Sequence, residues 1–340
     1  MRILFRTSGG RAIGKELGLG HLYRCLNLAE TLKKNELFFL VEDYGGIRKV
    51  LDKYCIGNVF FLRKNTELRA DISKTISIVK EKKIDVLIVD IYNVRHQYLR
   101  SLKQYTKVVF LSDLHRIDFP AHLVVNGFVG YRNRIVKNKY GARCVLGPRF
   151  QILNEGFAKK NHVRKTYKLL CTFGGFDEYN IVKIVIEQLL KLPNRIKTRV
   201  ILGPSTPKSM ELFKLCRRYG KDLSLVKHTD NMKKEICSSE FGMCSGGISS
   251  YEFASQGIRF AIICQVKHQL ITAMEWQRKH VAINLGLIHD RNTKQKVVQL
   301  LSELTENRLP YRKSRKSYVD GLGSIRVVRE ILKLKNIGVT

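Results

Sequence analysis

The sequence predicts an α/β fold built from two Rossmann-like domains. Two observations carry this prediction: apolar, β-rich runs alternate with segments of helical periodicity, and this alternation stops near residue 132 and begins again near residue 167. At 340 residues the chain is long enough for two hydrophobic cores. Such alternation is typical of βαβ units and a mostly parallel sheet. We expect domains over 1–150 and 160–340, with the carboxyl ends of their strands facing each other across a central cleft.

The first domain is expected to contain six strands. Each is a short apolar run, and the runs cover 3–5, 37–41, 59–62, 86–89, 108–111 and 123–125. Helical periodicity is clearest over 22–32, 69–80 and 98–105. Residues 132–164 lose this periodicity and are rich in glycine and basic residues, so we interpret them as the connection between the domains. A strand end at 145–148 is left open.

The second domain repeats the pattern. Its expected strands cover 167–173, 199–202, 223–226, 241–244 and 260–264. Its expected helices cover 181–190, 210–219, 232–237 and 269–279.

The composition is strongly basic. Lys and Arg number 62 against 29 Asp and Glu, which gives a formal net charge of +33 at pH 7. A charge of this size favours acidic partners such as nucleic acid, anionic lipid headgroups or phosphorylated small molecules. Many of the lysines lie on expected helices, where a solvated face also explains them. The charge alone therefore does not choose among these partners.

Eight cysteines are spread through apolar stretches without a Cys-x-x-Cys pair or zinc-ligand spacing, so we interpret them as reduced and buried. The N-terminus lacks the charged and apolar regions of a secretory signal, and no segment reaches about 18 consecutive apolar residues. We expect a cytoplasmic protein, with peripheral association with an anionic membrane left open.

One glycine-rich loop ends at a histidine that begins an expected helix. Gly18, Gly20 and His21 follow the first expected strand, and Arg24 lies one turn further on. Gly18, Gly20 and Arg24 are candidate substrate ligands. Glycines let backbone N–H groups approach a bound group, and the positive end of the helix favours an anion. Because histidine titrates near neutrality, His21 is a candidate general base. Taken alone, the motif also fits a histidine that caps the helix or packs against it.

Two further loops of small residues follow strands of the second domain. Backbone and hydroxyl donors in such loops can bind a diphosphate without a metal. The candidate ligands are Gly174, Gly175, Ser245, Gly246, Gly247, Ser249 and Ser250. None of the loops matches a P-loop or the dinucleotide fingerprint, which disfavours ATP hydrolysis and nicotinamide chemistry. Glu252, about a turn into the next helix, could accept both hydroxyls of a ribose or act only as a first-turn acid.

Other polar residues follow strands that end near the expected cleft. Tyr92 comes after the strand 86–89, where it could hold a sugar or the attacking water, or pack at the sheet edge. Asp113 could orient a neighbouring group. His268 and Gln269 follow the strand 260–264 and should enter the cleft from the second domain. The remaining histidines have no spacing that indicates a ligand set.

Taken together, these segments resemble the nucleotide-sugar hydrolases of pseudaminic acid biosynthesis, PseG, and the related spore-coat polysaccharide proteins, SpsG. Both are distant relatives of the MurG glycosyltransferase, which has the two-domain GT-B architecture. Matching pieces occur in the same order along nearly the whole chain, at 5–6, 18–21, 24–29, 89–92, 111–113, 173–177, 245–252, 320–323 and Arg326. The resemblance also implies a C-terminal helix over about 317–334, which in this architecture can cross back to the first domain.

The resemblance implies an enzyme that uses water to release UDP from UDP-2,4-diacetamido-2,4,6-trideoxy-β-L-altropyranose, breaking the anomeric C–O bond. It implies that His21 activates the water with Tyr92 beside it. The second domain would bind UDP, with the diphosphate on the two small-residue loops and the ribose on Glu252. No metal and no organic cofactor are implied. His268 stands where the family usually has Asn, and its different donors and acceptors leave a different sugar or acceptor open.

Two other function classes remain as alternatives. A GT-B glycosyltransferase would pass the sugar to a glycan or lipid acceptor and would release UDP only when that acceptor is present. A non-catalytic nucleic-acid-binding protein would use the +33 charge and bind with a steep salt dependence. No recognition motif or stripe of basic and aromatic residues accompanies the charge, so we expect no specific nucleic-acid partner.

Overall fold

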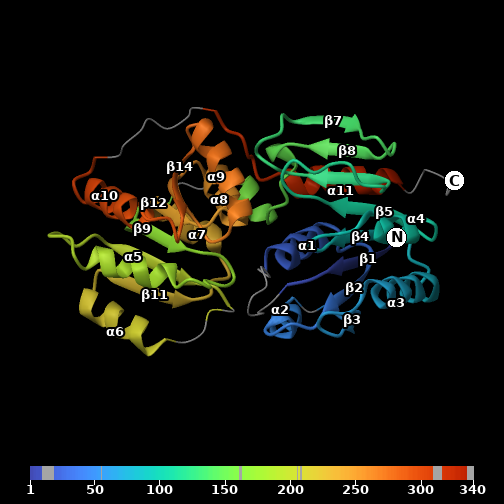
Figure 1. Cartoon of the computed structure of the whole chain (residues 1–340), viewed down its shortest axis with the longest axis horizontal. Helices are drawn as coiled ribbons and strands as arrows, with labels where there is room; N and C mark the ends of the chain where they lie inside the picture. The colour runs from blue at the N-terminus through green and yellow to red at the C-terminus, as the bar shows by residue number, and fades with distance from the viewer. Residues whose placement is uncertain are drawn as a thin grey trace. The chain divides into compact units, whose positions relative to one another are not determined.

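The computed structural model describes residues 1–9, 19–54, 56–160, 163–204, 206, 209–308 and 316–334 (Figure 1). The chain divides into two compact units. Unit 1 comprises Met1–Glu155 together with the segment that begins at Gly321, and unit 2 comprises Gly156–Asp320. The α/β fold class predicted from the sequence is confirmed, with two sheets that are mostly parallel.

Unit 1 is built on an eight-stranded sheet in the order β3-β2-β1-β4-β5-β6-β8-β7. Its strands are β1 (Arg2–Thr7), β2 (Glu36–Glu42), β3 (Val59–Leu62), β4 (Val86–Asp90), β5 (Lys107–Leu111), β6 (Leu123–Asn126), β7 (Arg134–Lys137) and β8 (Arg143–Leu146). Its helices are α1 (Gly20–Thr31), α2 (Ile47–Lys53), α3 (Leu68–Glu81), α4 (His96–Lys103) and α11 (Gly323–Lys333), with a short 3-10 turn at Pro148–Phe150.

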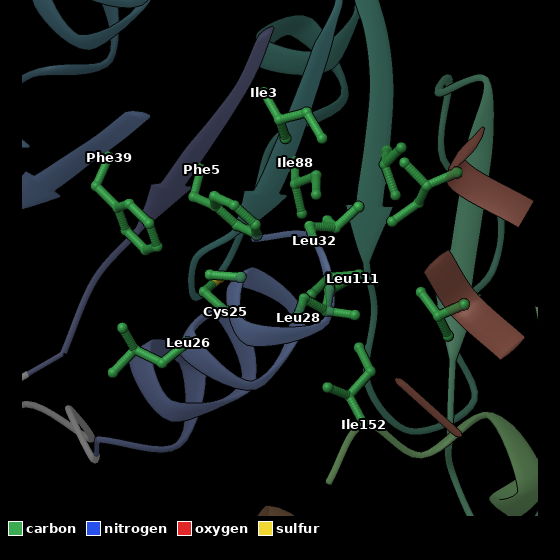
Figure 2. Close-up of a cluster of buried hydrophobic side chains, with 14 of the residues drawn as sticks. Ile3, Phe5, Cys25, Leu26, Leu28, Leu32, Phe39, Ile88, Leu111 and Ile152 are labelled. Carbon is green, nitrogen blue, oxygen red and sulfur yellow. The ribbon is translucent and has the colours of Figure 1, made fainter. Parts of the chain in front are cut away.

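Helices cover both faces of this sheet, which is why its central strands are apolar without interruption. Every residue of β4 and β5 is buried. Along β1 the side chains alternate: Ile3 and Phe5 join the core beneath α1, α2 and α11, while Leu4 joins the core beneath α3 and α4. Figure 2 shows the first of these cores, where Phe5 meets Cys25 of α1. This packing fixes α1 against β1 and β4.

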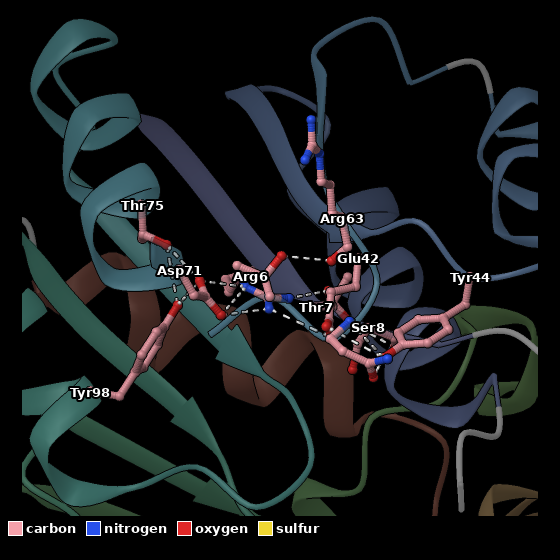
Figure 3. Close-up of polar contacts among 11 residues, drawn as sticks. Arg6, Thr7, Ser8, Glu42, Tyr44, Arg63, Asp71, Thr75 and Tyr98 are labelled. Carbon is pink, nitrogen blue, oxygen red and sulfur yellow. Dashed lines mark hydrogen bonds and ion pairs between the residues drawn. The ribbon is translucent and has the colours of Figure 1, made fainter. Parts of the chain in front are cut away.

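A buried polar network ties β1 to α3 and α4 (Figure 3). Arg6 is only 2% exposed, and its Nη2 donates to Asp71 Oδ2 at 2.7 Å. Tyr98 and Thr75 donate from their hydroxyls to Asp71 Oδ1, at 3.0 and 3.1 Å. A buried cation is tolerated only when it is paired in this way. Arg6 Nη1 also donates to the Thr7 carbonyl at 2.6 Å, which braces the end of β1.

The expected connection between domains contains a hairpin, of which the sequence analysis left open only a strand end at 145–148. Residues 134–137 and 143–146 form β7 and β8, and β8 continues the sheet by pairing in parallel with β6. Strand β7 lacks a clear apolar pattern because it is an edge strand with mostly exposed side chains. In β8, residues 144–146 are buried and apolar. The chain passes from unit 1 to unit 2 only after Glu155.

The C-terminal helix α11 is part of unit 1. The expected second domain ran to residue 340, with a final helix that can pack back on the first domain. Val327 and Ile331 are fully buried in the core that also holds α1. Ser324 Oγ donates to the Leu153 carbonyl at 2.5 Å, and Arg143 Nε donates to Glu330 Oε2 at 2.7 Å. Helix α11 therefore helps to hold α1, the helix that carries His21.

Unit 2 contains a six-stranded parallel sheet in the order β11-β10-β9-β12-β13-β14. Its strands are β9 (Tyr167–Thr172), β10 (Thr198–Leu202), β11 (Leu223–Lys227), β12 (Ser239–Cys244), β13 (Arg259–Cys264) and β14 (Ala282–Leu287). Its helices are α5 (Ile181–Leu189), α6 (Met210–Tyr219), α7 (Met232–Cys237), α8 (Ile248–Gln256), α9 (Lys267–Arg278) and α10 (Thr293–Thr305), with a 3-10 turn at Glu155–Ala158 before the sheet. Of these elements, β14 and α10 were not expected.

Seven cysteines lie in the described part of the chain, all free and six of them buried. Within the same residues, no helix is both long and apolar enough to cross a membrane.

Candidate active site

In unit 1 the strand order reverses between β1 and β4. From β1 the chain moves outward to β2 and β3, and it then returns to β4 on the other side. Open parallel sheets bind ligands at the carboxyl ends of the two strands that flank such a reversal. Thr7 at the end of β1 pairs with Asp90 at the end of β4, and the helix that follows β1 begins with Gly20 and His21. Gly18 lies outside the described residues.

At this edge His21 meets Asp90. The two side chains are 2.6 Å apart, from His21 Nδ1 to Asp90 Oδ1. Asp90 is fully buried, and the His21 side chain is 19% exposed. An ionised carboxylate only accepts hydrogen bonds, so Nδ1 must carry the proton. In neutral His21 the other nitrogen, Nε2, is therefore unprotonated and can act as a base.

Arg24, one helical turn after His21, holds the carboxylate in place. Its Nε donates to Asp90 Oδ2 at 2.7 Å and its Nη2 donates to Asp90 Oδ1 at 2.6 Å. Its Nη1 donates to Asp113 Oδ1, also at 2.6 Å. Asp113 follows β5, and its side chain is 55% exposed. Arg24 thus joins two carboxylates that come from the ends of neighbouring strands.

The loop that carries Asp113 is itself braced. Asn126 Nδ2 donates to the Leu114 carbonyl at 2.8 Å, and the Ser112 hydroxyl donates to the Arg116 carbonyl. These bonds fix the backbone on both sides of Asp113.

The electrostatics of this cluster favour an ionised Asp90 and a basic His21. Burial disfavours the charge on Asp90, but Arg24 and then His21 outweigh it and lower the pKa of the carboxyl. Burial also opposes the charge on His21, and the neighbouring Asp90 overcomes this and raises the pKa of the imidazole. A raised pKa makes His21 a better proton acceptor once it is neutral.

Unit 2 has the same kind of reversal, between β9 and β12. The loops that follow these two strands adjoin each other: a Cβ on Gly174, whose φ is +82°, would lie 3.7 Å from Ser245 Oγ. A Cβ on Gly246 would lie 2.8 Å from the Cβ and carbonyl oxygen of Gln269, so this glycine packs directly against the first turn of α9. The structure thus brings the two small-residue loops and Gln269 to one edge of the sheet.

The two helices that start at these loops differ in their N-termini. At α5, Asp177 accepts from the backbone N–H groups of Ile181 and Val182, at 2.8 and 2.9 Å. This carboxylate occupies the place that an anion would take. At α8 no side chain caps the helix and its first turn has no acidic residue. A Cβ on its N-cap residue, Gly247, would meet nothing within 4 Å. The N-terminus of α8 is the better place for a phosphate.

Glu252 lies in α8, five residues after Gly247, with a partly buried side chain. Burial raises its pKa to about 7. A carboxyl group with that pKa changes charge near neutrality, so its protonation can depend on what binds beside it.

The chain is similar in sequence to other proteins over most of its length. It is 28% identical over 282 residues to the uncharacterized protein MJ1062 of Methanocaldococcus jannaschii. The match covers 78% of this chain and 56% of MJ1062, so the chain spans little more than half of this relative. It is 25% identical over 337 residues to the spore coat polysaccharide biosynthesis protein SpsG of Bacillus subtilis, covering 92% and 94% of the two chains.

A third relative is the UDP-2,4-diacetamido-2,4,6-trideoxy-beta-L-altropyranose hydrolase of Campylobacter jejuni, 26% identical over 282 residues that cover 80% of this chain and 95% of the relative. No protein-family model matches the chain. Among solved structures, Acinetobacter baumannii MurG aligns with a TM-score of 0.64 at 13% identity and covers 98% of this chain and 100% of MurG. The UDP-GlcNAc 2-epimerase of M. jannaschii aligns with a TM-score of 0.53 at 11% identity, with 98% and 100% covered.

This chain is a PseG/SpsG-like protein with the GT-B fold. The resemblance inferred from short sequence segments is therefore confirmed.

Three residues of this PseG/SpsG-like chain were expected to bind substrate but have side chains already engaged within the protein. Arg24 pairs with Asp90 and Asp113. Ser250 is fully buried, and its hydroxyl donates to the Gly247 carbonyl at 2.7 Å and accepts from Trp276 Nε1 at 3.1 Å. Gln269 Oε1 accepts from the Gln265 backbone N–H at 2.9 Å.

The other expected residues lie near strand ends. Tyr92, two residues after Asp90, is 46% exposed, and His268 is exposed at the start of α9. Gly175 and Ser249 are half-buried in the two loops of unit 2, and Ser245 is buried.

Sequence analysis placed Asp90 only within the matching stretch 89–92 and did not select it as a site residue. The available signal was its position: it is the first charged residue after a wholly apolar strand, which places it at the carboxyl edge. Among the described residues, no group of three or more His, Cys, Asp or Glu side chains is arranged to hold a metal ion.

Proposed function

We propose that this PseG/SpsG-like protein is a UDP-sugar hydrolase in which His21 activates water for attack on the anomeric carbon. The observation that carries the proposal is the 2.6 Å contact between His21 Nδ1 and buried Asp90, which leaves Nε2 as a proton acceptor. The Campylobacter relative is named as a hydrolase of such a substrate, and other structural neighbours with this fold were solved with UDP or a UDP-sugar.

In the proposed reaction the oxygen of a water molecule bonds to the anomeric carbon as the bond from that carbon to the UDP oxygen breaks. The water proton passes to His21 Nε2, and the bonding electron pair leaves with UDP. Asp90 stabilises the imidazolium that forms, because its carboxylate faces the protonated Nδ1. The Tyr92 hydroxyl is proposed to hold the sugar or the attacking water.

Unit 2 is proposed to bind the UDP part of the substrate. The uncapped N-terminus of α8 and the backbones of Gly174 and Gly175 supply donors to the diphosphate. Ser245 and Ser249 are proposed to add hydroxyl donors, while Glu252 accepts from the ribose hydroxyls. Ser250 and Gln269 hold the loops that present these groups.

The proposal is tested by UDP release from UDP-2,4-diacetamido-2,4,6-trideoxy-β-L-altropyranose, with no acceptor and no added metal. Wild type should release UDP and free sugar, and His21→Ala should not. The matched control is His122→Gln, because His122 lies at the amino end of β6 and only accepts a backbone N–H from Val108 at 2.9 Å. It should retain wild-type activity.

Each alternative has its own outcome. Release from a different UDP-sugar in water would correct the sugar and keep the hydrolase. Release only after a glycan or lipid acceptor is added would replace the hydrolase with a glycosyltransferase. Undiminished activity of His21→Ala would contradict the role of His21 as base.

A further inference from the structure

Thr206 stands out in unit 2 because its hydroxyl is buried and unpaired. Among the described residues, its Oγ1 is the only buried side-chain nitrogen or oxygen without a hydrogen-bond partner. Thr206 as a whole is 8% exposed. Buried hydroxyl groups are nearly always paired, since an unpaired one loses its bonds to water without replacement. The Thr206 hydroxyl can therefore form a hydrogen bond with a bound ligand.

Thr206 lies beside one of the loops proposed to bind diphosphate. Its backbone N–H donates to the Gly203 carbonyl at 3.0 Å, which closes a turn with Pro204 in the second position. Gly203 packs directly on the loop after β9: a Cβ there would lie 2.2 Å from the Gly174 carbonyl oxygen and 2.4 Å from the Gly175 carbonyl. The turn after β10 is thus in contact with the loop after β9.

The sheet order explains this contact. Strand β10 is the immediate neighbour of β9, and β9 borders the reversal where open sheets bind ligands. A residue just after β10 is therefore one strand away from the reversal, at the same carboxyl edge.

We propose that Thr206 is a further ligand of the nucleoside diphosphate, with its hydroxyl donating a hydrogen bond to a phosphate oxygen. This inference rests on the proposed binding of UDP by unit 2. The diphosphate would then contact three segments of unit 2: the loop after β9, the loop after β12, and the turn at Gly203, Pro204 and Thr206. The bond satisfies the hydroxyl, which costs stability while it is unpaired.

The experiment measures UDP binding by calorimetry on the full chain, together with the melting temperature of each variant. Thr206→Val removes the hydroxyl and keeps the shape. It should weaken UDP binding about 3- to 10-fold, the usual range for one neutral hydrogen bond. Its melting temperature should not fall, because no bond within the protein is lost. Thr206→Ser keeps the hydroxyl and should bind UDP like wild type.

The matched control is Thr198→Val, also in unit 2. Thr198 is fully buried, and its Oγ1 donates to the Ile196 carbonyl at 2.9 Å. This variant should melt at a lower temperature and bind UDP normally, which is the opposite signature. Uridine, which has no phosphate, should bind wild type and Thr206→Val equally.

The outcomes separate this inference from the proposed function. If wild type binds UDP and Thr206→Val binds it equally well, the role of Thr206 is overturned and the function stands. If Thr206→Val weakens the binding of uridine as much as the binding of UDP, the proposed contact with phosphate is overturned. If wild type binds no UDP, both proposals fail.

Discussion

Arg24 donates to both carboxylate oxygens of Asp90, at 2.7 Å from Nε and 2.6 Å from Nη2. The oxygen that faces Nη2 also lies 2.6 Å from His21 Nδ1. Despite burial, Arg24 and then His21 lower the pKa of Asp90, so the carboxylate is ionised and accepts all three bonds. Arg24 therefore acts on the proposed base indirectly, by fixing the charge and the orientation of the group that holds it.

Asp90→Asn should abolish most activity. The Asn amide can turn a donor toward His21 Nδ1, which would favour the tautomer with the proton on Nε2 and leave no base for water. We expect the rate of UDP release to fall by about 100-fold or more, chiefly in kcat, as for other histidine bases whose carboxylate is neutralised.

The control for this variant is Asp71→Asn, which removes the carboxylate paired with Arg6. Breaking either buried pair costs about 3–5 kcal/mol of stability. Only Asp90→Asn should lose activity beyond the loss of folded protein, because Asp71 belongs to the network on α3 and α4. Equal specific activities of the two folded variants would contradict the role of Asp90.

Asp113→Asn should shift the acid limb of the pH–rate profile. The negative charge of Asp113 favours protonated His21, although it contributes less than Asp90. Removing it lowers the pKa of His21. His21 is then neutral at lower pH, so the acid limb of the pH profile of kcat/KM moves to lower pH. A limb that stays in place, measured from pH 5 to 9, would show that Asp113 does not influence the base.

The sequence was sufficient for the central strands and for the start of α1, because these depend on local pattern. Continuous apolar runs predicted β4 and β5, which are buried on both faces, and the glycine loop predicted the helix start. The edge strand β7 was missed because an exposed edge strand needs no apolar alternation.

The partners of His21 could not be predicted in the same way. Asp90 lies 69 positions from His21, and the two meet only because β1 pairs with β4. Arg24 was expected to contact substrate because it lies on a helix beside a glycine loop. Its local sequence does not reveal that Asp90 and Asp113, from the ends of other strands, lie within hydrogen-bond distance. Thr206 has no local pattern at all, since an unpaired hydroxyl is visible only in three dimensions.

Gly203→Ala should damage the nucleotide site and the fold together. The new Cβ would lie 2.2 Å from the Gly174 carbonyl oxygen, so the loop after β9 must move. Overpacking of this kind costs about 1–3 kcal/mol, and the displaced loop should weaken UDP binding. Gly57→Ala is the control, because a Cβ there meets nothing within 4 Å. Melting curves and UDP titrations of both variants check this prediction, and normal UDP binding by Gly203→Ala would contradict it.

Glu252 should make substrate binding depend on pH. Burial raises its pKa to about 7, and only the ionised carboxylate can accept from both ribose hydroxyls. Affinity should therefore weaken as the pH falls through 7 and level off above it. The ligand should be the UDP-sugar rather than UDP, because a terminal phosphate itself titrates near pH 6. Using the His21→Ala background prevents turnover and removes the titration of His21. In that background Glu252→Gln should bind the UDP-sugar more weakly, and its affinity should not change with pH. If the affinity still depends on pH, a group other than Glu252 is responsible.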